Sequence, residues 1–301
     1  MKPDASIVIP TFNRRELLRR TLQSLADQTY PAERFEVVVV DDGSDDGTDA
    51  MVRQLKVPYR LRYVWQPNSG RAAARNRGVR AAAADLLIFL DSDVAVAREF
   101  VEAHVRAHDV PGRVVKGPVI HVPTLDWPLD REPTLADVST AFFATANVSV
   151  ARRHLEAAGL FNESFREYGW EDLELGDRLR ALGLRSYTAH AARGYHYSPP
   201  WRLADLPAQR ERERQRGHNA IRYYRLRPTL RVRAKLLLFP PVFWLDRLAF
   251  PWNWCDGPAF QRFLQALERR GPRWLLRFLV RIVLHHDYVC GMREGLRREG
   301  R

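Results

Sequence analysis

Short apolar runs rich in β-branched residues alternate with helix-like stretches over the first 110 residues of this 301-residue chain. The alternation is typical of βαβ units around a parallel sheet, and it constrains the fold more than any other feature. The run at 36–40 is almost continuously apolar, as in a strand buried on both faces. The pattern predicts strands at 6–10, 36–40, 60–65 and 86–90, with helices at 14–28 and 70–84.

The pattern is less regular between residues 111 and 200. It predicts strands at 113–120, 144–150 and 185–190 and a helix at 172–182. Beyond it, residues 205–227 form an arginine-dense helix candidate, and 274–284 is amphipathic. We therefore predict an α/β fold, with a mostly parallel sheet flanked by helices at 1–204 and a basic, helical C-terminal region at 205–301.

Charge divides the chain at about the same place. Residues 1–200 hold 26 lysines and arginines against 27 aspartates and glutamates, whereas residues 201–301 hold 22 against 9. The net charge of +12 therefore comes from the last third of the chain. It says nothing about the chemistry of the first two thirds.

Three interpretations of the basic C-terminal region are open. In the first, residues 210–216 are a solvated helix face whose arginines are partly balanced by glutamates. In the second, the Trp, Phe and Leu residues beside arginine at 236–254 and 274–284 attach the chain to an anionic membrane surface. A dimer interface would show the same apolar pattern. The third, nucleic-acid binding, rests only on the high isoelectric point and lacks a recognisable binding motif, so we expect no nucleic-acid partner.

The cysteines and apolar segments indicate the compartment. Cys255 and Cys290 are too few for a disulfide framework, and we expect both to be reduced. No secretory segment is visible at the N-terminus. The longest uncharged apolar run, 236–245, contains two prolines and is half the ~20 residues that a spanning helix needs. We expect a cytoplasmic protein, either free or attached peripherally to the inner face of the cell membrane.

Acidic residues follow the fourth predicted strand. Asp91 and Asp93 come directly after 86–90, at the end of the strand where open α/β sheets bind ligands. Two carboxylates one residue apart can share a hard cation such as Mg²⁺ or Mn²⁺, which would neutralise charge on a departing diphosphate. A loop or helix cap is the alternative interpretation of this motif.

Two further acids, Asp41 and Asp42, follow the second predicted strand. Either carboxylate could accept hydrogen bonds from a base or a ribose. A capped strand-to-helix turn would explain Gly43, Gly47 and Thr48, which come next. It would not explain two adjacent acids at the end of a buried strand.

Five motifs resemble those of the family 2 glycosyltransferases, both in sequence and in their order along residues 6–198. They are Ile7-Val-Ile-Pro-Thr-Phe-Asn-Arg14, Asp41-Asp-Gly-Ser44, Asn68-Ser-Gly70 with Ala74-Arg-Asn76, Asp91-Ser-Asp93, and Gly169-Trp-Glu-Asp-Leu-Glu-Leu-Gly176. The resemblance implies the glycosyltransferase-A fold, with a donor half at about 1–110 and an acceptor half at about 111–204. It also implies inverting transfer from a nucleoside diphosphate sugar, with UDP favoured, to a hydroxyl on a glycan or lipid-linked acceptor in cell-envelope synthesis.

The resemblance also assigns roles to individual residues. It places Pro10 and Thr11 against the nucleotide, Asp41 or Asp42 on the base, Arg75 at the diphosphate or base, Asp93 on the metal, and Asp91 on the metal or the ribose. For Arg75, a helix-surface position is the alternative.

The acceptor half receives four assignments. The resemblance makes Asp172 the general base, with Glu171 beside it in a supporting or acceptor-binding role. It places Asn147 either beside the donor sugar or in a supporting or acceptor-binding role. His196 would be a third metal ligand or contact the diphosphate, the alternative being a packed or solvent-facing histidine. Without the resemblance, Glu171 and Asp172 could equally be acids at a helix N-terminus, where the helix dipole favours negative charge. Two rival functions remain: a retaining nucleotide-sugar transferase, and a non-catalytic basic protein that binds nucleic acid.

Overall fold

The computed structural model describes residues 2–126 and 129–298. Its contacts divide the chain into two compact units. The N-terminal unit comprises Met1–Arg166 and Glu171–Pro199, and the C-terminal unit comprises Glu167–Trp170 and Pro200–Arg301. Each unit has its own hydrophobic core.

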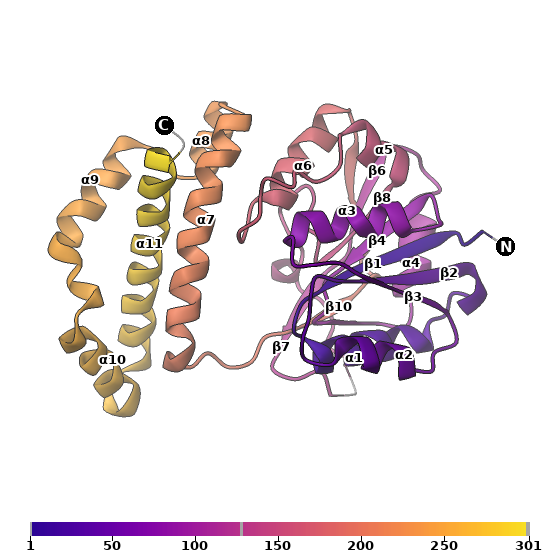
Figure 1. The fold of residues 1–301 in the computed structure, drawn as a ribbon, viewed down its shortest axis with the longest axis horizontal. Coiled ribbons are helices and arrows are strands. Elements are labelled where there is room, and N and C mark those ends of the chain that lie inside the picture. Colours follow the sequence, from indigo (N-terminus) through magenta and orange to yellow (C-terminus); the bar gives the residue numbers. More distant parts are fainter. Residues whose placement is uncertain (1, 127–128, 299–301) are drawn as a thin grey trace. The chain divides into compact units, whose positions relative to one another are not determined.

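A seven-stranded sheet in the order β3-β2-β1-β4-β8-β6-β9 forms the centre of the N-terminal unit (Figure 1). Its strands are β1 Ala5–Thr11, β2 Phe35–Asp41, β3 Arg60–Trp65, β4 Leu86–Leu90, β6 Arg113–Lys116, β8 Asn147–Ala151 and β9 Arg185–Thr188. β8 is antiparallel to β4 and β6, and the other pairs are parallel. The predicted mostly parallel sheet is confirmed.

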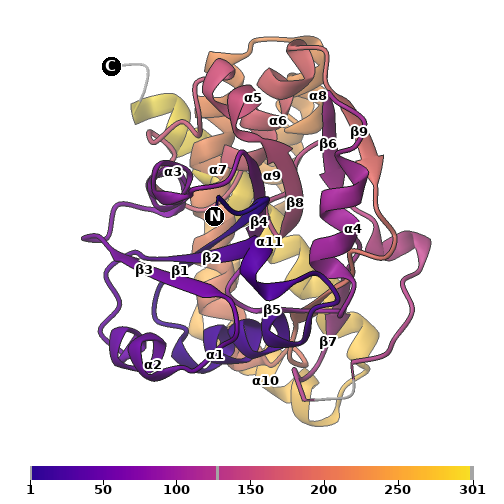
Figure 2. The same ribbon diagram turned by 90° about the vertical axis from the view of Figure 1, so that its right-hand side faces the viewer.

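Helices cover both faces of this sheet (Figure 2). One face packs against α1 Arg15–Ser24, α2 Thr48–Gln54 and α4 Phe100–Ala107, and the other against α3 Arg71–Ala81, α5 Arg152–Ala157 and α6 Glu171–Ala181. Along β1, Ile7 and Ile9 join the first core and Val8 joins the second, because successive strand side chains point to opposite faces. Gly78 lets α3 approach closely, since a Cβ there would lie 2.3 Å from Val8 Cγ1.

The single strand predicted at 113–120 is wrong, because the chain breaks there into β6 and β7 Val119–Val122. β7 belongs to a second, three-stranded sheet with β5 Val94–Val96 and β10 Gly194–Tyr197, in the order β5-β10-β7. The break lies at Gly117 and Pro118. A Cβ on Gly117 would lie 2.0 Å from the Ala192 carbonyl oxygen, and proline has no N–H for a ladder. The strand predicted at 144–150 begins only at Asn147, after a turn.

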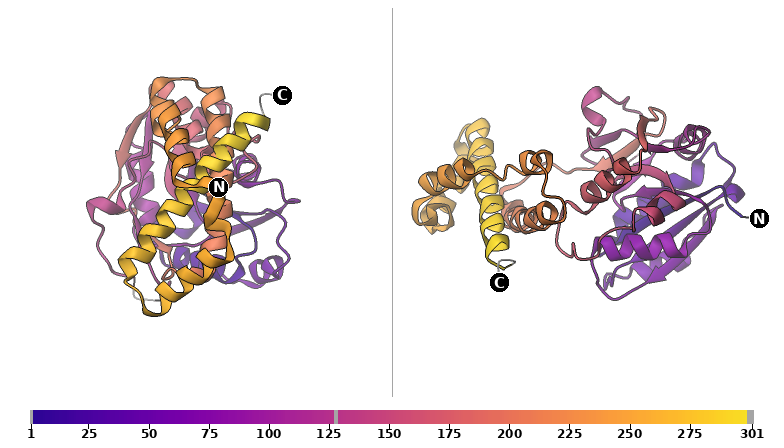
Figure 3. Two further views of the ribbon diagram at one scale, coloured as in Figure 1. Left: turned by 90° about the vertical axis from the view of Figure 1, so that its left-hand side faces the viewer. Right: turned by 90° about the horizontal axis from the view of Figure 1, so that it is seen from above.

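The C-terminal unit is helical, which confirms the predicted helical extension (Figure 3). Its helices are α7 Leu206–Leu226, α8 Leu230–Lys235, α9 Pro240–Ala249, α10 Pro258–Arg270 and α11 Arg273–Arg298. α7 and α11 lie side by side and run in the same direction. Glycines permit this close packing: a Cβ on Gly217 would lie 2.1 Å from the Tyr288 carbonyl oxygen, and one on Gly291 would lie 2.0 Å from that of Arg214.

The arginines of 210–216 are largely structural rather than solvated. Arg210 Nε donates to Asp287 Oδ2 at 2.6 Å, and Arg214 Nη2 donates to Asp287 Oδ1 at 3.1 Å, while Asp287 is fully buried. The guanidinium of Arg216 lies 4.9 Å from the Trp170 ring centroid. Arg212 is exposed, and the side chains of Arg214 and Arg216 are 39% and 41% exposed. Because the buried Asp287 carboxylate needs cationic partners, the interpretation of this run as a solvated face holds only in part.

Cys255 and Cys290 are both free. Across residues 2–126 and 129–298, none of the helices has the length and apolar character needed to cross a bilayer.

Candidate functional site

The carboxyl ends of β2, β1 and β4 meet at one edge of the large sheet. β1 lies between the other two strands, and Thr11 at its end pairs in register with Asp41 at the end of β2. Asp91 follows β4 at the same edge. This brings the first, second and fourth sequence motifs together where ligands bind in open α/β sheets.

Asp41 is buried and holds the turn that follows β2. Its Oδ1 accepts a hydrogen bond from the backbone N–H of Ser44 at 2.8 Å, and its Oδ2 accepts one from the Tyr63 hydroxyl at 2.6 Å. Burial, and then the Asp41 carboxylate, raise the pKa of Tyr63, so the phenol stays a donor. Asp41 thus fixes the backbone of the predicted nucleotide-binding motif.

Asp42 joins that motif to the next one. Its carboxylate accepts from Gln66 Nε2 at 2.7 Å and from the backbone N–H groups of Ser69 and Gly70, both at 2.9 Å. Both predicted base-contacting acids therefore already accept hydrogen bonds from the protein. Their assignment to the base stays a prediction.

Two buried donors among the predicted nucleotide-binding residues have no protein partner. Within the part of the chain that the structure describes, neither Thr11 Oγ1 nor Arg75 Nε makes a hydrogen bond. An unsatisfied buried polar group costs about 1–3 kcal/mol, so such groups call for an explanation. A ligand with acceptor oxygens, such as a nucleotide, would satisfy both. Pro10, the neighbour of Thr11, is half-buried.

Arg75 connects the donor motifs to the acceptor half. It lies on α3 and is 3% exposed, which rules out the helix-surface interpretation. Its Nη1 donates to Glu171 Oε1 at 2.8 Å, and its Nη2 lies 3.4 Å from Asp91 Oδ1. Glu171 is itself buried, so this ion pair is shielded from water. One guanidinium therefore ties Asp91 to the first residue of α6.

Asp172 lies next to that ion pair, in the first turn of α6, and is half-buried. Burial of its surroundings and the neighbouring Glu171 carboxylate raise the pKa of Asp172 above the usual range of aspartate, and Arg75 partly offsets this. A carboxyl group whose pKa is raised toward neutrality is a stronger base than an ordinary aspartate. The local environment therefore suits proton transfer.

Asp93 lies beside an arginine and a histidine. Its carboxylate forms an ion pair with Arg14, and its Oδ2 lies 3.6 Å from His196 Nε2 on β10. The His196 Nδ1 in turn lies 2.9 Å from Ser198 Oγ. His196 is therefore close to Asp93, as its predicted role at the metal requires.

The side chains near the end of β4 are of types that can bind a divalent cation, although they do not surround a single point as a chelate would. Asp91 and Asp93 offer carboxylate oxygens and His196 offers an imidazole nitrogen. Among residues 2–126 and 129–298, no group of three or more His, Cys, Asp or Glu side chains is placed to hold a metal ion. The remaining ligands would have to come from a bound diphosphate or from water.

The Asn147 side chain is buried and makes hydrogen bonds to three separate segments of the N-terminal unit. Its Nδ2 donates to the carbonyl oxygens of Pro118 at 3.0 Å and Ala192 at 2.8 Å, and its Oδ1 lies 2.9 Å from His104 Nε2. The side chain is 2% exposed. These contacts suit the supporting role that was one of its two predicted assignments.

Sequence reasoning gave no role to Arg14, although this residue lies in the first quoted motif. It contacts Asp93 from 79 positions away in the sequence, which no local pattern reveals. Tyr63 and Gln66, which hold Asp41 and Asp42, were missed in the same way. A polar residue at the end of a predicted strand was the available signal for Gln66.

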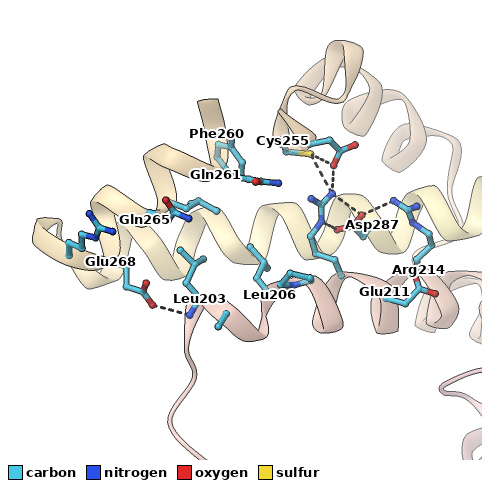
Figure 4. A pocket seen from close by; sticks show the side chains of 16 residues that line it. Leu203, Leu206, Glu211, Arg214, Cys255, Phe260, Gln261, Gln265, Glu268 and Asp287 are labelled. Carbon is cyan, nitrogen blue, oxygen red and sulfur yellow. Dashed lines mark hydrogen bonds and ion pairs between the residues drawn. The ribbon is translucent and has the colours of Figure 1, made fainter. Parts of the chain in front are cut away.

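A cavity of about 780 Å³ lies in the C-terminal unit, beside α7, α10 and α11 (Figure 4). None of the site residues predicted from the sequence lines it. At this cavity Arg210 contacts the buried Asp287 and also Asp256, whose side chain is half exposed. Apolar and charged side chains both line the cavity.

Comparisons of sequence relate this chain to known glycosyltransferases. A family model described as Glycosyl transferase family 2 matches residues 6–168. The validoxylamine A glucosyltransferase of Streptomyces hygroscopicus subsp. jinggangensis (strain 5008) is 37% identical over 221 residues, which cover 60% of this chain and 52% of that protein. The hyaluronan synthase of Pasteurella multocida is 31% identical over 260 residues, covering 71% of this chain and 26% of the synthase. This chain thus spans about half the length of the glucosyltransferase and less of the synthase.

Two solved structures share the fold. The mannosyltransferase PcManGT from Pyrobaculum calidifontis, solved in complex with GDP-Man and Mn²⁺, superimposes with a TM-score of 0.65 at 20% identity, covering 98% of this chain and 88% of that one. S. aureus TarS in complex with UDP superimposes with a TM-score of 0.54 at 20% identity, covering 99% and 92%. The predicted fold class is confirmed.

Proposed function

Since this chain belongs to glycosyl transferase family 2, we propose that it transfers a sugar from a nucleoside diphosphate donor to a hydroxyl group, with inversion at the anomeric carbon. The observation that carries the proposal is the position of Arg75, whose guanidinium contacts both Asp91 and Glu171. It keeps the acidic end of β4 close to the start of α6. Donor-binding chemistry and base chemistry thus share one edge of the sheet.

Asp172 is the proposed general base. In an inverting transfer, the acceptor hydroxyl attacks the anomeric carbon from the face opposite the leaving diphosphate. The Asp172 carboxylate takes the hydroxyl proton as the new C–O bond forms, and the electron pair of the breaking bond stays on the diphosphate oxygen. Glu171 remains paired with Arg75 and supports the helix terminus. The two adjacent acids therefore have different roles.

We assign Thr11 and Arg75 to the nucleotide diphosphate, with Pro10 as the wall of the nucleotide pocket and Asp41 or Asp42 at the base. The two unpartnered donors, Thr11 Oγ1 and Arg75 Nε, support this assignment. Guanidinium groups pair well with phosphate oxygens. UDP is the proposed nucleotide, and the fold neighbour TarS was solved with UDP.

We assign Asp91 and Asp93 to a divalent cation, Mg²⁺ or Mn²⁺, with His196 as a further ligand. When bound, such a cation neutralises charge that develops on the leaving diphosphate. The spacing of the two acids, the His196 distance of 3.6 Å and the Mn²⁺ in the PcManGT complex support this. Arg14, which pairs with Asp93, would share that carboxylate with the cation.

The proposed acceptor is a hydroxyl-bearing glycan or lipid-linked saccharide used in cell-envelope polysaccharide, glycolipid or glycoconjugate synthesis. Support comes from the relatives, which include a glucosyltransferase and a hyaluronan synthase. We also propose that residues 1–204 form the catalytic part and that residues 205–301 form a separate C-terminal region.

A donor panel tests the proposed function. UDP-, GDP- and dTDP-sugars are added with Mn²⁺ or Mg²⁺, and thermal unfolding and donor hydrolysis are followed. We expect one nucleotide class to raise the Tm and to be hydrolysed slowly, with both effects lost when the cation is chelated. Absence of both effects with every donor would favour a non-catalytic binding protein.

The pH dependence of transfer should report Asp172. The group must be ionised to accept a proton, and burial and Glu171 raise its pKa while Arg75 lowers it and Asp91 raises it further. We therefore expect kcat to fall as the pH is lowered, with a midpoint above the ~3.9 of an ordinary aspartate. Initial rates at saturating substrate between about pH 4 and pH 9 measure this. A rate that stays constant down to about pH 4 would contradict the assignment.

We also propose that the C-terminal region attaches peripherally to the anionic, cytoplasmic face of a membrane. Trp252, Trp274 and Trp244 are 97%, 70% and 63% exposed in a region with a large excess of arginine. Exposed aromatic side chains beside cationic ones are typical of segments that bind the membrane interface.

Co-sedimentation with vesicles tests the attachment. We expect the protein to sediment with vesicles of phosphatidylglycerol and phosphatidylcholine but not with phosphatidylcholine alone. The double variant Trp252→Ser/Trp274→Ser should bind less, whereas Trp65→Ser, at an exposed tryptophan of β3, should bind like the wild type. Equal sedimentation of all three proteins would contradict the proposal.

A further inference from the structure

A buried histidine of α11 lies between a carboxylate and a thiol in the C-terminal unit. His286 Nδ1 lies 2.8 Å from Asp246 Oδ1 of α9, and His286 Nε2 lies 3.5 Å from Cys290 Sγ. Residues one turn apart on a helix share a face, so His286 and Cys290 meet along α11. All three residues lie within the C-terminal unit, outside the residues proposed for sugar transfer.

The contacts of Asp246 and Phe250 fix the His286 ring. Asp246 is 5% exposed, and its second oxygen, Oδ2, lies 2.7 Å from Arg293 Nη1. The Phe250 ring stacks on the imidazole with the centroids 4.1 Å apart and an interplanar angle of 15°. Because the carboxylate holds Nδ1, the imidazole presents Nε2 to the Cys290 thiol.

The surroundings of His286 favour its positively charged form. Burial by itself lowers the pKa of His286, but hydrogen bonds with Asp246 and then with Cys290 raise it more, to about 9. A nucleophile beside a histidine that a third group orients is the arrangement that activates cysteines in proteins. His286 is therefore placed to stabilise a Cys290 thiolate, which is the nucleophilic form of cysteine.

Arg214 of α7 brings a second cation to Cys290. Burial lowers the pKa of this arginine, but Asp287, and then Glu294 and Cys290, raise it above the usual value. Its guanidinium thus interacts electrostatically with the thiol, although its hydrogen bond goes to Asp287. Cys290 is also partly exposed. Partly exposed sites near cationic groups are where reactive cysteines occur.

Cys255, in the same unit, has the opposite surroundings. It is 1% exposed. Burial and then Asp256 raise the pKa of its thiol to about 11, although Arg210 Nη2 lies 3.8 Å from its Sγ. The two thiols therefore provide a comparison within one folded chain.

We propose that Cys290 is a modification site that forms a mixed disulfide with small, low-molecular-weight disulfides, activated by the His286 imidazole that Asp246 holds. The Cys290 thiolate attacks one sulfur of the small disulfide and forms the new S–S bond. The electron pair of the old S–S bond leaves on the other sulfur, which takes a proton from water. This reactivity does not depend on the proposed sugar transfer.

Oxidised glutathione is the probe for this reaction. The full-length, reduced protein is incubated with it at about pH 6, where an ordinary thiol with a pKa of ~8.5 is almost fully protonated. Mass spectrometry of the peptides that contain Cys290 and Cys255 gives the two rates. We expect Cys290 to react at least about 10-fold faster than Cys255, and faster than in the protein unfolded with urea. A Cys290 rate no higher than either reference would overturn the inference.

The variant His286→Asn tests the role of the imidazole. The asparagine amide can still donate to Asp246, but it carries no positive charge beside Cys290. We expect the Cys290 rate at about pH 6 to fall roughly 10-fold. His285→Asn is the matched control, because His285 is exposed and its ring faces Tyr288 at 6.4 Å, so this variant should react like the wild type. A folded His286→Asn protein with wild-type Cys290 reactivity would contradict the assignment. If that variant does not fold, the comparison of folded with urea-unfolded wild type decides.

Discussion

Replacing Asp172 with asparagine should reduce glycosyl transfer by about 10²- to 10⁴-fold, the usual contribution of a positioned general base. Asparagine has the same size and keeps an acceptor oxygen for the Leu173 N–H, which Asp172 Oδ1 accepts at 2.8 Å. It cannot take a proton from the acceptor hydroxyl. Initial transfer rates with saturating donor and acceptor measure the effect.

The fold should survive this substitution, because it removes a carboxyl group whose pKa is already raised by burial and by Glu171. Thermal unfolding of the variant should therefore match that of the wild type, or occur at a slightly higher temperature. Asp49→Asn makes the same chemical change at an exposed position of α2 and should leave transfer intact. Near-wild-type turnover of Asp172→Asn would remove this residue from the role of base.

Replacing Asp93 with alanine is the second change from which we expect a large loss. The variant lacks one carboxylate of the proposed cation pair, and it leaves Arg14 without its partner at this position. A bound cation contributes several kcal/mol to the stabilisation of developing charge, and every 1.4 kcal/mol is about tenfold in rate. We therefore expect transfer to fall at least about 10²-fold, together with the loss of cation-dependent stabilisation by the donor.

Asp85→Ala serves as the control for this second change. Asp85 precedes β4, whereas Asp91 and Asp93 follow it, and its side chain is 79% exposed in an ion pair with Lys2. Because exposed ion pairs contribute little, this variant should keep both activity and the response to Mn²⁺. An Asp93→Ala protein with unchanged turnover and unchanged Mn²⁺-dependent stabilisation would contradict the assignment.

The central strands were predictable because burial on both faces leaves a local signature. β1, β2 and β4 read as apolar runs, and each ends at the residues that the structure brings to the site. β5 was missed because it has only three residues, too few to show a period, and β10, which has four, was missed as well. The break at Gly117 was missed because it depends on the approach of the Ala192 carbonyl oxygen, which is distant in sequence.

The residues that gather at this edge of the sheet could be named from the sequence, but the contacts between them could not, and their roles stay predictions. The motifs indicated Arg75 and Glu171 separately, yet their ion pair joins positions 96 residues apart. The link from Arg14 to Asp93 is likewise a tertiary contact. Such contacts emerge only when helices and strands have packed.

The anomeric configuration of the product distinguishes inverting from retaining transfer. The donor that stabilises the protein is supplied with an α-linked sugar, and the new linkage is examined by NMR before and after the Asp172→Asn substitution. We expect a β-linked product from the wild type and none above background from the variant. An α-linked product would show retention and would contradict both the inverting mechanism and the role of Asp172 as its base.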